Sequence, residues 1–451
     1  MGWPAPQIRR SECGECASAG PASIAGMHPA PASSSPTATA AATTMPAPPL
    51  PRAFSRLAAC NLAAQSAEQI ALAAVPLFAV LAFQAGPGEV GLLSSAQTLP
   101  FLLLSIPLGL LADRWSRQRL MLWAEGLRAL SLLALVWLAV QGHASLAWLA
   151  VLGFIGAVGT VGFSVAAPAL VPSLVAPSAL AAANGRLELA RSLAFAAGPA
   201  LGGALVGWAG ASFAFALAAG LSLAAWIALA GVQEPARAQP PRRHPVTELK
   251  EGAALVLRHP LLRPVLLTAI VWNLAWFVLQ AAYVPYAVTQ LGLDGAGVGF
   301  TLATYGAGMV TGSLLAARAI RALPYGLAVL VGPFCSVAAM AVMCATLAWP
   351  SGVLAALSFF LFGLGPILWT ITSTTLRQHL TPASMLGRVS AIFLTVNTGA
   401  RPIGAALGGW VGAGWGAEAC LWLALAGFLV QAAVCTLSPI RALKTLPTPE
   451  A

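Results

Sequence analysis

Long apolar runs separated by short polar turns are the main pattern along this chain. Each run is about twenty residues long, the length that a helix needs to cross the hydrocarbon core of a bilayer. A membrane β-barrel would instead show alternating segments of about ten residues. We therefore predict an all-α integral membrane protein. Twelve spanning helices are expected, at residues 57–83, 90–112, 120–140, 146–170, 189–208, 211–231, 262–286, 297–317, 325–347, 353–376, 389–411 and 418–438.

A longer polar segment at residues 234–260 divides the spans into two sets of six. We expect it to be a cytoplasmic central loop between an N-terminal bundle at 53–233 and a C-terminal bundle at 261–440. Residues 1–52 are rich in Ala, Pro, Ser and Thr, which predicts a disordered tail and no cleaved signal peptide. Residues 441–451 form a second, short tail.

The two halves of the chain resemble each other. The glycine pattern from Gly198 to Gly203 in the fifth span recurs from Gly404 to Gly409 in the eleventh, 206 residues later. Parallel six-helix repeats are a known transporter plan, in which the substrate path lies between the halves. We therefore predict two pseudo-symmetric bundles.

Composition and charge support this assignment and orient it. Hydrophobic residues make up 59% of the chain and charged residues 8%, with a mean hydropathy of +0.82, which excludes a water-soluble globule. Lys and Arg collect in alternate loops, whereas the other loops carry Glu89, His143, Asp294 and Glu418 and no basic residue. Basic loops stay on the cytoplasmic side, so both termini are expected there, in a bacterial inner membrane. The basic residues expected on this side include Arg52, Arg56, Arg114, Arg117, Arg119, Arg186, Arg191, Arg318, Arg321, Arg377, Arg388, Arg441 and Lys444.

This segregation accounts for the net charge of +10 without a nucleic-acid partner. The arginines of the central loop are expected to contact anionic lipid headgroups. Cysteine and histidine spacing predicts no metal site, and neither a Walker phosphate loop nor a nucleophile elbow is present, so we expect no cofactor and no enzyme activity.

The turn after the second span holds an acid among arginines. It resembles the signature Gly-x-Leu-Ala-Asp-Arg-x-Gly-Arg of the major facilitator superfamily, with Ser116 in place of the signature's second glycine. The resemblance covers about residues 55–440 and implies a transporter fold. The residues that fit this signature or nearly fit it are Gly109, Leu111, Ala112, Asp113, Arg114, Arg117 and Arg119.

Asp113 is the candidate gating residue of this turn. Its carboxylate can accept from backbone N–H groups at a helix N-terminus, and the start of the eleventh span near Arg388 is the expected partner. Such a contact would hold the halves together in an outward-facing state. The alternative is an ordinary basic loop with one solvated acid.

Further stretches narrow the resemblance. Gly198, Pro199, Gly202 and Gly203 resemble the fifth-span signature of exporters. Two other stretches resemble the branch that contains enterobactin exporters and macrolide-efflux permeases. They are Ala169–Pro172 followed by Leu180, Ala183 and Asn184, and Leu386–Arg388 leading to Arg401–Gly404. This branch implies proton-driven export of a hydrophobic compound.

The same glycines have a structural interpretation. Their spacing leaves a strip without side chains on one helix face, where a neighbour can approach closely. We expect the strip to pack against the eighth span, at Gly306, Gly308 and Gly312, and to control leak across an outer gate. Plain close packing explains the glycines equally well.

Charged residues inside the spans are the sharpest functional signal, since each costs on the order of 3 kcal/mol at a helix centre. Glu68 lies 11 residues into the first span and Arg401 lies 12 residues into the eleventh, roughly 16 and 18 Å deep at 1.5 Å per residue. We expect both to line a central cavity and to interact electrostatically, and we take Glu68 and Arg401 as the proton-coupling candidates. The alternative is a fixed structural ion pair. Glu125 and Arg128, three residues apart near the inner surface, are expected to form an intrahelical pair.

Polar and aromatic residues within the spans are candidates for the substrate cavity, although each one alone is more often a packing residue. They are Asn61, Gln65, Gln97, Asn273, Trp276, Gln280, Tyr283, Trp369 and Asn397.

The leading hypothesis is therefore a monomeric secondary transporter that exports a hydrophobic or amphipathic small molecule in exchange for protons. One alternative is a metabolite or sugar importer on the same fold, which the Gly198–Pro199 signature disfavours. From another class, the chain could be a membrane sensor that transports nothing.

Overall fold

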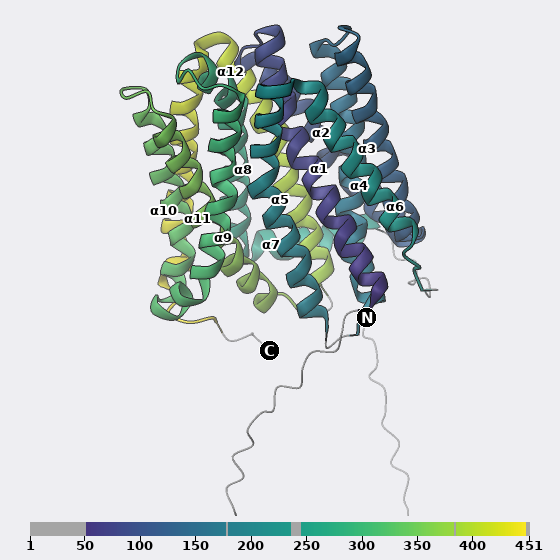
Figure 1. Ribbon diagram of the computed structural model, residues 1–451. Coiled ribbons are helices and arrows are strands. Elements are labelled where there is room, and N and C mark those ends of the chain that lie inside the picture. Colours follow the sequence, from purple (N-terminus) through teal and green to yellow (C-terminus); the bar gives the residue numbers. More distant parts are fainter. Residues whose placement is uncertain (1–50, 177–178, 236–244, 383–384, 448–451) are drawn as a thin grey trace, which may run out of the picture. The chain divides into compact units, whose positions relative to one another are not determined.

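The computed structural model describes residues 51–447 except 177–178, 236–244 and 383–384. The predicted N-terminal tail therefore lies almost wholly outside the described residues. Six long helices come first. They are labelled in Figure 1. They are α1 (Arg52–Phe83), α2 (Pro87–Arg114), α3 (Arg117–Val140), α4 (Leu146–Leu174), α5 (Leu180–Ala209) and α6 (Ala211–Ala230).

A shorter helix and five long ones follow. They are α7 (Pro245–Arg258), α8 (Leu262–Thr289), α9 (Gly295–Ala322), α10 (Tyr325–Ala345), α11 (Gly352–Leu380) and α12 (Leu386–Leu437), and the short 3₁₀ helix η2 (Pro439–Ala442) follows α12. Eleven of the described helices are long and apolar enough to cross a membrane.

The twelfth crossing is contained in α12. This helix has 52 residues, about 78 Å at 1.5 Å per residue, which is more than twice the thickness of a hydrocarbon core. It is broken at Gly416, where φ is 81° and ψ is 176°. Gly416 therefore forms the turn between two antiparallel arms, which correspond to the predicted eleventh and twelfth spans.

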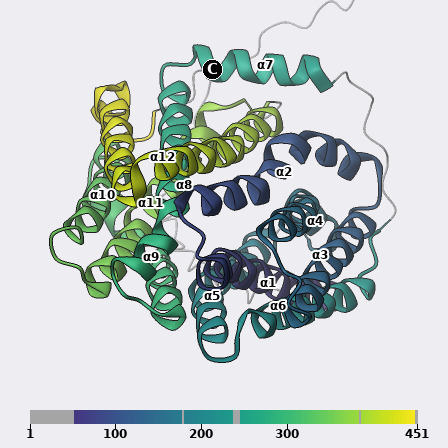
Figure 2. The ribbon, with the colours of Figure 1, turned by 90° about the horizontal axis from the view of Figure 1, so that it is seen from above.

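The helices pack as two six-helix bundles. In the first, α1 packs against α5 and α6, α3 against α4 and α6, and α2 against α4. In the second, α8 packs against α12, while α11 lies between α9 and α10. The bundles meet where α2 contacts α12 and where α5 contacts α9, as the end-on view in Figure 2 shows. The outer surface is apolar, with Leu130 67% and Leu314 72% exposed, as expected for a surface in contact with lipid.

Glycines join the bundles at one end, which we call the glycine end. A Cβ atom built on Gly91 of α2 would lie 2.3 Å from the Gly409 Cα of α12, and one on Gly203 of α5 would lie 2.4 Å from the Gly295 carbonyl oxygen of α9. Backbones approach this closely only because side chains are absent. The opposite end, where α1 begins and α12 ends, is called the basic end.

The predicted glycine strip is divided between two faces. Gly203 does pack against α9, but its partners are Gly295 and Gly299. Gly198 and Gly202 instead face Gln69 and Ile70 of α1. The expectation that Gly308 and Gly312 pack against this strip is wrong: both face Phe360 or Leu364 of α11, because they lie on the other side of α9 from Gly306, which does contact α5.

The central loop contains α7, a helix that the sequence analysis did not separate from the loop. It runs crosswise to the spanning helices in Figure 2. Gly252 packs against Arg388 and Ile392 of α12, and Glu251 forms an ion pair with Arg388. The start of α12 is therefore held by α7.

Candidate functional site

A cavity of about 350 Å³ lies between the two bundles. Residues of α1 to α5 line one side, and residues of α8, α9, α11 and α12 line the other. Its charged lining residues are Glu68, Arg128, Arg191 and Arg401. The predicted meeting of Glu68 and Arg401 in one cavity is therefore found, together with two arginines that the sequence analysis placed nearer the surface.

Two of the three arginines are paired within their own helices. Arg128 forms an ion pair with Glu125, and its Nη1 also donates to the Ala64 carbonyl oxygen of α1 at 3.1 Å. The predicted intrahelical pair is therefore confirmed, and it is almost fully buried, with side chains 4% and 0% exposed. Arg191 donates through Nε to both carboxylate oxygens of Glu188, at 3.1 and 3.0 Å.

Arg401 has a different environment. Its guanidinium lies 5.5 Å from the ring centre of Phe101 on α2 and 5.8 Å from that of Phe277 on α8, distances at which aromatic rings attract cations. Its Nε is buried and has no hydrogen-bond partner in the described part of the chain. Arg401 therefore connects both bundles through aromatic contacts and has no ion pair within 4.0 Å among the described residues.

Glu68 interacts electrostatically with Arg128, Arg401 and Arg191. Among the described residues it is not within ion-pair distance of any of them. The positive charges of the three arginines are thus balanced by three carboxylates, those of Glu68, Glu125 and Glu188, while Glu68 is ionised. Protonation of Glu68 would leave the cavity with one uncompensated positive charge, which a low-dielectric site makes significant.

Aromatic rings form the wall contributed by the second bundle. Trp272 and Trp276 of α8 are stacked with ring centres 5.3 Å apart and planes 10° from parallel. Tyr305 of α9 lies 5.1 Å from Trp276. Asn273 and Gln280 add amide groups to the same wall. The cavity lining therefore combines charged groups with aromatic rings, which suits an amphipathic ligand.

The predicted cavity residues divide into two groups. Gln97, Asn273, Trp276 and Gln280 line the cavity. The other five are not among its lining residues: Asn61, Gln65, Tyr283, Trp369 and Asn397.

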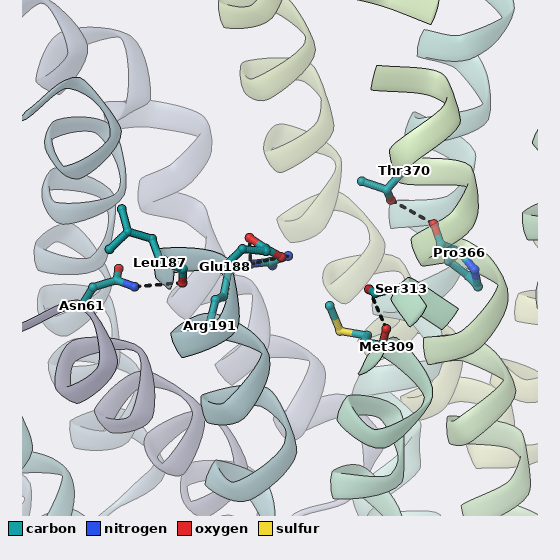
Figure 3. A network of polar contacts seen from close by, with 8 residues as sticks. All are labelled: Asn61, Leu187, Glu188, Arg191, Met309, Ser313, Pro366 and Thr370. Atoms are coloured by element: carbon teal, nitrogen blue, oxygen red, sulfur yellow. Dashed lines mark hydrogen bonds and ion pairs between the residues drawn. The ribbon is translucent and has the colours of Figure 1, made fainter. Parts of the chain in front are cut away.

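Four of these five contact neighbouring helices instead. Asn61 donates to the Leu187 carbonyl oxygen of α5 at 3.2 Å, beside the Glu188–Arg191 pair in Figure 3. Tyr283 is fully buried and its hydroxyl bonds to Thr301 of α9. Trp369 lies against Gly332 of α10. Asn397 accepts from Asn273, so it supports a lining residue without being one.

Intrahelical hydrogen bonds satisfy many hydroxyl groups near the cavity. Figure 3 shows Ser313 donating to the Met309 carbonyl oxygen at 2.8 Å and Thr370 donating to that of Pro366 at 2.9 Å. Such bonds are expected where no water is available. The lining residue Thr98 likewise donates to the Ser94 carbonyl oxygen at 2.7 Å, so its hydroxyl is less available to a ligand than the amides of α8.

The turn from Gly109 to Arg119 joins α2 to α3 at the basic end. Arg117 donates to the Ala169 carbonyl oxygen of α4, whereas Arg114 and Arg119 are exposed. Ser116 caps α3 and donates to Glu234 at 2.7 Å, so the segment after α6 secures the turn. Gly109 faces Val165 of α4. The side chain of Asp113, and with it the predicted latch, lies outside the described residues.

The family model of the Major Facilitator Superfamily matches residues 57–405. The chain belongs to the major facilitator superfamily. It is thus a membrane transporter of small molecules and not an enzyme.

Relatives with curated names are similar to this transporter over most of its length. The enterobactin exporter EntS of Escherichia coli O1:K1 / APEC is 27% identical over 317 residues, which cover 68% of this chain and 72% of the relative. The exporter of the same name from Citrobacter koseri is 28% identical over 314 residues, with the same coverage of both chains.

Solved structures share the transporter's fold at lower identity. A bacterial homologue of the iron transporter ferroportin, in an inward-facing state, aligns with a TM-score of 0.68 and 18% identity over 86% of this chain and 98% of that one. The nucleoside transporter NupG aligns with a TM-score of 0.68 and 11% identity over 85% and 98%. These likenesses concern the fold alone.

Proposed function

We propose that the transporter exports an amphipathic small molecule from the cytoplasm in exchange for protons, by alternating access. The observation that carries this proposal is the cavity between the bundles, whose lining contains Glu68, three arginines and a group of aromatic rings. An ionisable group inside a membrane is costly and usually functional. Glu68 is the proton carrier in this proposal, and Arg401 is its long-range partner.

The structure corresponds, in this proposal, to an inward-facing state. The close contacts at the glycine end support a closed outer gate, at Gly91 with Gly409 and at Gly203 with Gly295. The arginines at the basic end support its assignment to the cytoplasm. A compound would then enter the cavity from the cytoplasm and leave after the glycine contacts part.

Export as the direction is supported by the relatives. The curated relatives are named as exporters, and the Gly198–Pro199 segment of α5 resembles an exporter signature. Siderophores, drugs and other natural products are the candidate substrates. The gating role of Gly109, Asp113, Arg114, Arg117, Arg119 and Arg388 belongs to the same proposal.

The first experiment compares drug susceptibility in an efflux-deficient bacterial host with and without the transporter, over a panel of amphipathic compounds, with and without a protonophore. We expect resistance to some compounds, and we expect the protonophore to abolish it. A transporter-dependent gain in sensitivity would indicate import. Unchanged sensitivity across the panel would contradict export of these compounds.

The second experiment tests Glu68→Gln on a compound that the panel identifies. Removing the ionisable carboxyl should lower proton-driven efflux by about tenfold or more, since each 1.4 kcal/mol of lost coupling is a factor of ten. Glu89→Gln is the matched control, because Glu89 caps α2 at the glycine end, away from the cavity lining. Full proton-driven efflux by the Glu68→Gln variant would show that Glu68 is not the proton carrier.

A further inference from the structure

A second pocket, of about 310 Å³, lies at the basic end where α7, α8 and the last turn of α12 meet. We call it the corner pocket. It is separate from the central cavity and shares none of its lining residues. Its lining residues are Leu257, Arg258, His259, Pro260, Arg263, Pro264, Leu267, Val434, Leu437 and Ser438.

We propose that the corner pocket binds one anionic phospholipid from the leaflet at the basic end, with its phosphate between Arg258 and Arg263 and an acyl chain along α8 and α12. The proposal is independent of the transported substrate and of the direction of transport. A lipid fits because the pocket has two arginines at its edge and leucines along one wall, and it lies where the spanning helix α8 begins.

The charge of the pocket favours an anion. Its lining contains Arg258 and Arg263 and no acidic residue. Both arginines are exposed, and within the described residues neither makes an ion pair. Nδ1 of His259 accepts from the backbone N–H groups of Leu261 and Leu262, at 3.1 and 3.3 Å, and so fixes the turn that separates the two arginines. Guanidinium groups bind phosphate through paired N–H donors.

The apolar wall favours a lipid over free phosphate. Leu257 is 55% exposed, Leu267 38% and Leu437 84%. Leu267 lies one turn beyond Arg263 on α8, and Leu437 ends the last arm of α12. An inorganic ion would leave these side chains uncovered, whereas an acyl chain would cover them.

Comparison of the two bundles singles out this corner. In the first bundle, Arg56 of α1 donates to the Gly231 carbonyl oxygen after α6 at 2.5 Å and ties the two helices together. The internal offset of 206 residues places Leu437 opposite Gly231 and Arg263 next to the counterpart of Arg56. The counterpart of Arg56 is therefore Leu262, which has no side-chain donor, and Arg263 beside it lines the corner pocket.

The test measures phospholipid retention by the purified full-length transporter in detergent, using native mass spectrometry. Delipidated protein is titrated with phosphatidylglycerol, with phosphatidylcholine of the same acyl chains, or with inorganic phosphate. We expect one phosphatidylglycerol to be retained, at least about fivefold more than phosphatidylcholine. Equal retention of the two lipids, or displacement of phosphatidylglycerol by equimolar inorganic phosphate, would overturn the proposal.

Variants locate the site. Arg258→Gln with Arg263→Gln should lower retention of phosphatidylglycerol about fivefold. Arg318→Gln with Arg321→Gln is the control, since it removes the same charge from exposed positions near the end of α9 and should leave retention unchanged. Leu437→Ser changes the wall without changing any charge and should also weaken retention. Equal loss in the arginine variant and its control would show a diffuse charge effect and refute a defined pocket.

Discussion

Arg401 is the cavity residue with the most distinctive environment. Arg128 and Arg191 have acid partners three residues away, whereas Arg401 lies between the rings of Phe101 and Phe277. Those rings belong to different bundles. A movement of one bundle relative to the other must therefore change the surroundings of this guanidinium.

Substitution of Arg401 tests this arrangement. Arg401→Gln removes the charge opposite Glu68 and should lower efflux about tenfold or more. Arg401→Lys keeps the charge but loses the planar stacking group, so we expect an intermediate rate. The measurement is the initial efflux rate in proteoliposomes, with expression and melting temperature checked for each variant. Equal rates for wild type and both variants would remove Arg401 from the mechanism.

The sequence predicts how deep a residue lies within its spanning helix. It does not predict which face of the helix the side chain occupies. Glu68 and Arg401 could be assigned to one cavity because both are charged and lie at similar depths in their spans. The apolar pattern starts the fifth span at residue 189, which places Arg191 at its cytoplasmic end. In the structure α5 already begins at Leu180, so Arg191 lies about three turns inside the helix. Tyr283 was assigned to the cavity, yet its side chain points to Thr301, a choice that only packing decides.

The two arms of α12 illustrate which helices can be predicted from the sequence. Apolar length predicted both arms, and the gap expected at 411–418 contains the turn at Gly416. The crosswise helix α7 was missed because its 14 residues are too few to span and lie in a charged loop. Its attachment to α12, through Glu251 and Arg388, depends on the folded arrangement.

Gly416→Ala tests the turn in α12. Its φ of 81° with ψ of 176° belongs to a region that is essentially restricted to glycine, so alanine should cost about 1–3 kcal/mol. We expect a melting temperature several degrees lower in detergent, measured by intrinsic fluorescence. Gly414→Ala is the control, because a Cβ there meets no atom within 4 Å and its φ is not positive. Identical melting temperatures for the two variants would argue against a strained turn at Gly416.

At the scale of the whole molecule, the arrangement of charge sets the orientation. The loop between α3 and α4 carries His143 and no Lys or Arg, whereas α9 ends with Arg318 and Arg321. Basic loops are retained in the cytoplasm, so the α3–α4 loop and the basic end of α9 should lie on opposite sides of the membrane.

Alkaline phosphatase fusions measure this orientation directly, because the enzyme is active only outside the cytoplasm. A fusion after His143 should be active, and one after Arg321 should be inactive. Comparable expression of both fusions, checked by immunoblot, is the control. The reverse pattern would invert the membrane orientation and with it the assignment of the inner gate.

The contacts at the glycine end set how easily the two bundles can part. Gly91 meets Gly409, and Gly203 meets Gly295 and Gly299, so backbone packs directly on backbone at these positions. Glycines have no side-chain rotamers to lose, so contact between them costs little side-chain conformational entropy, and their separation regains little. The closed and open states can then lie within a few kcal/mol of each other, and the differential affinity of a ligand for the two states is enough to shift their populations.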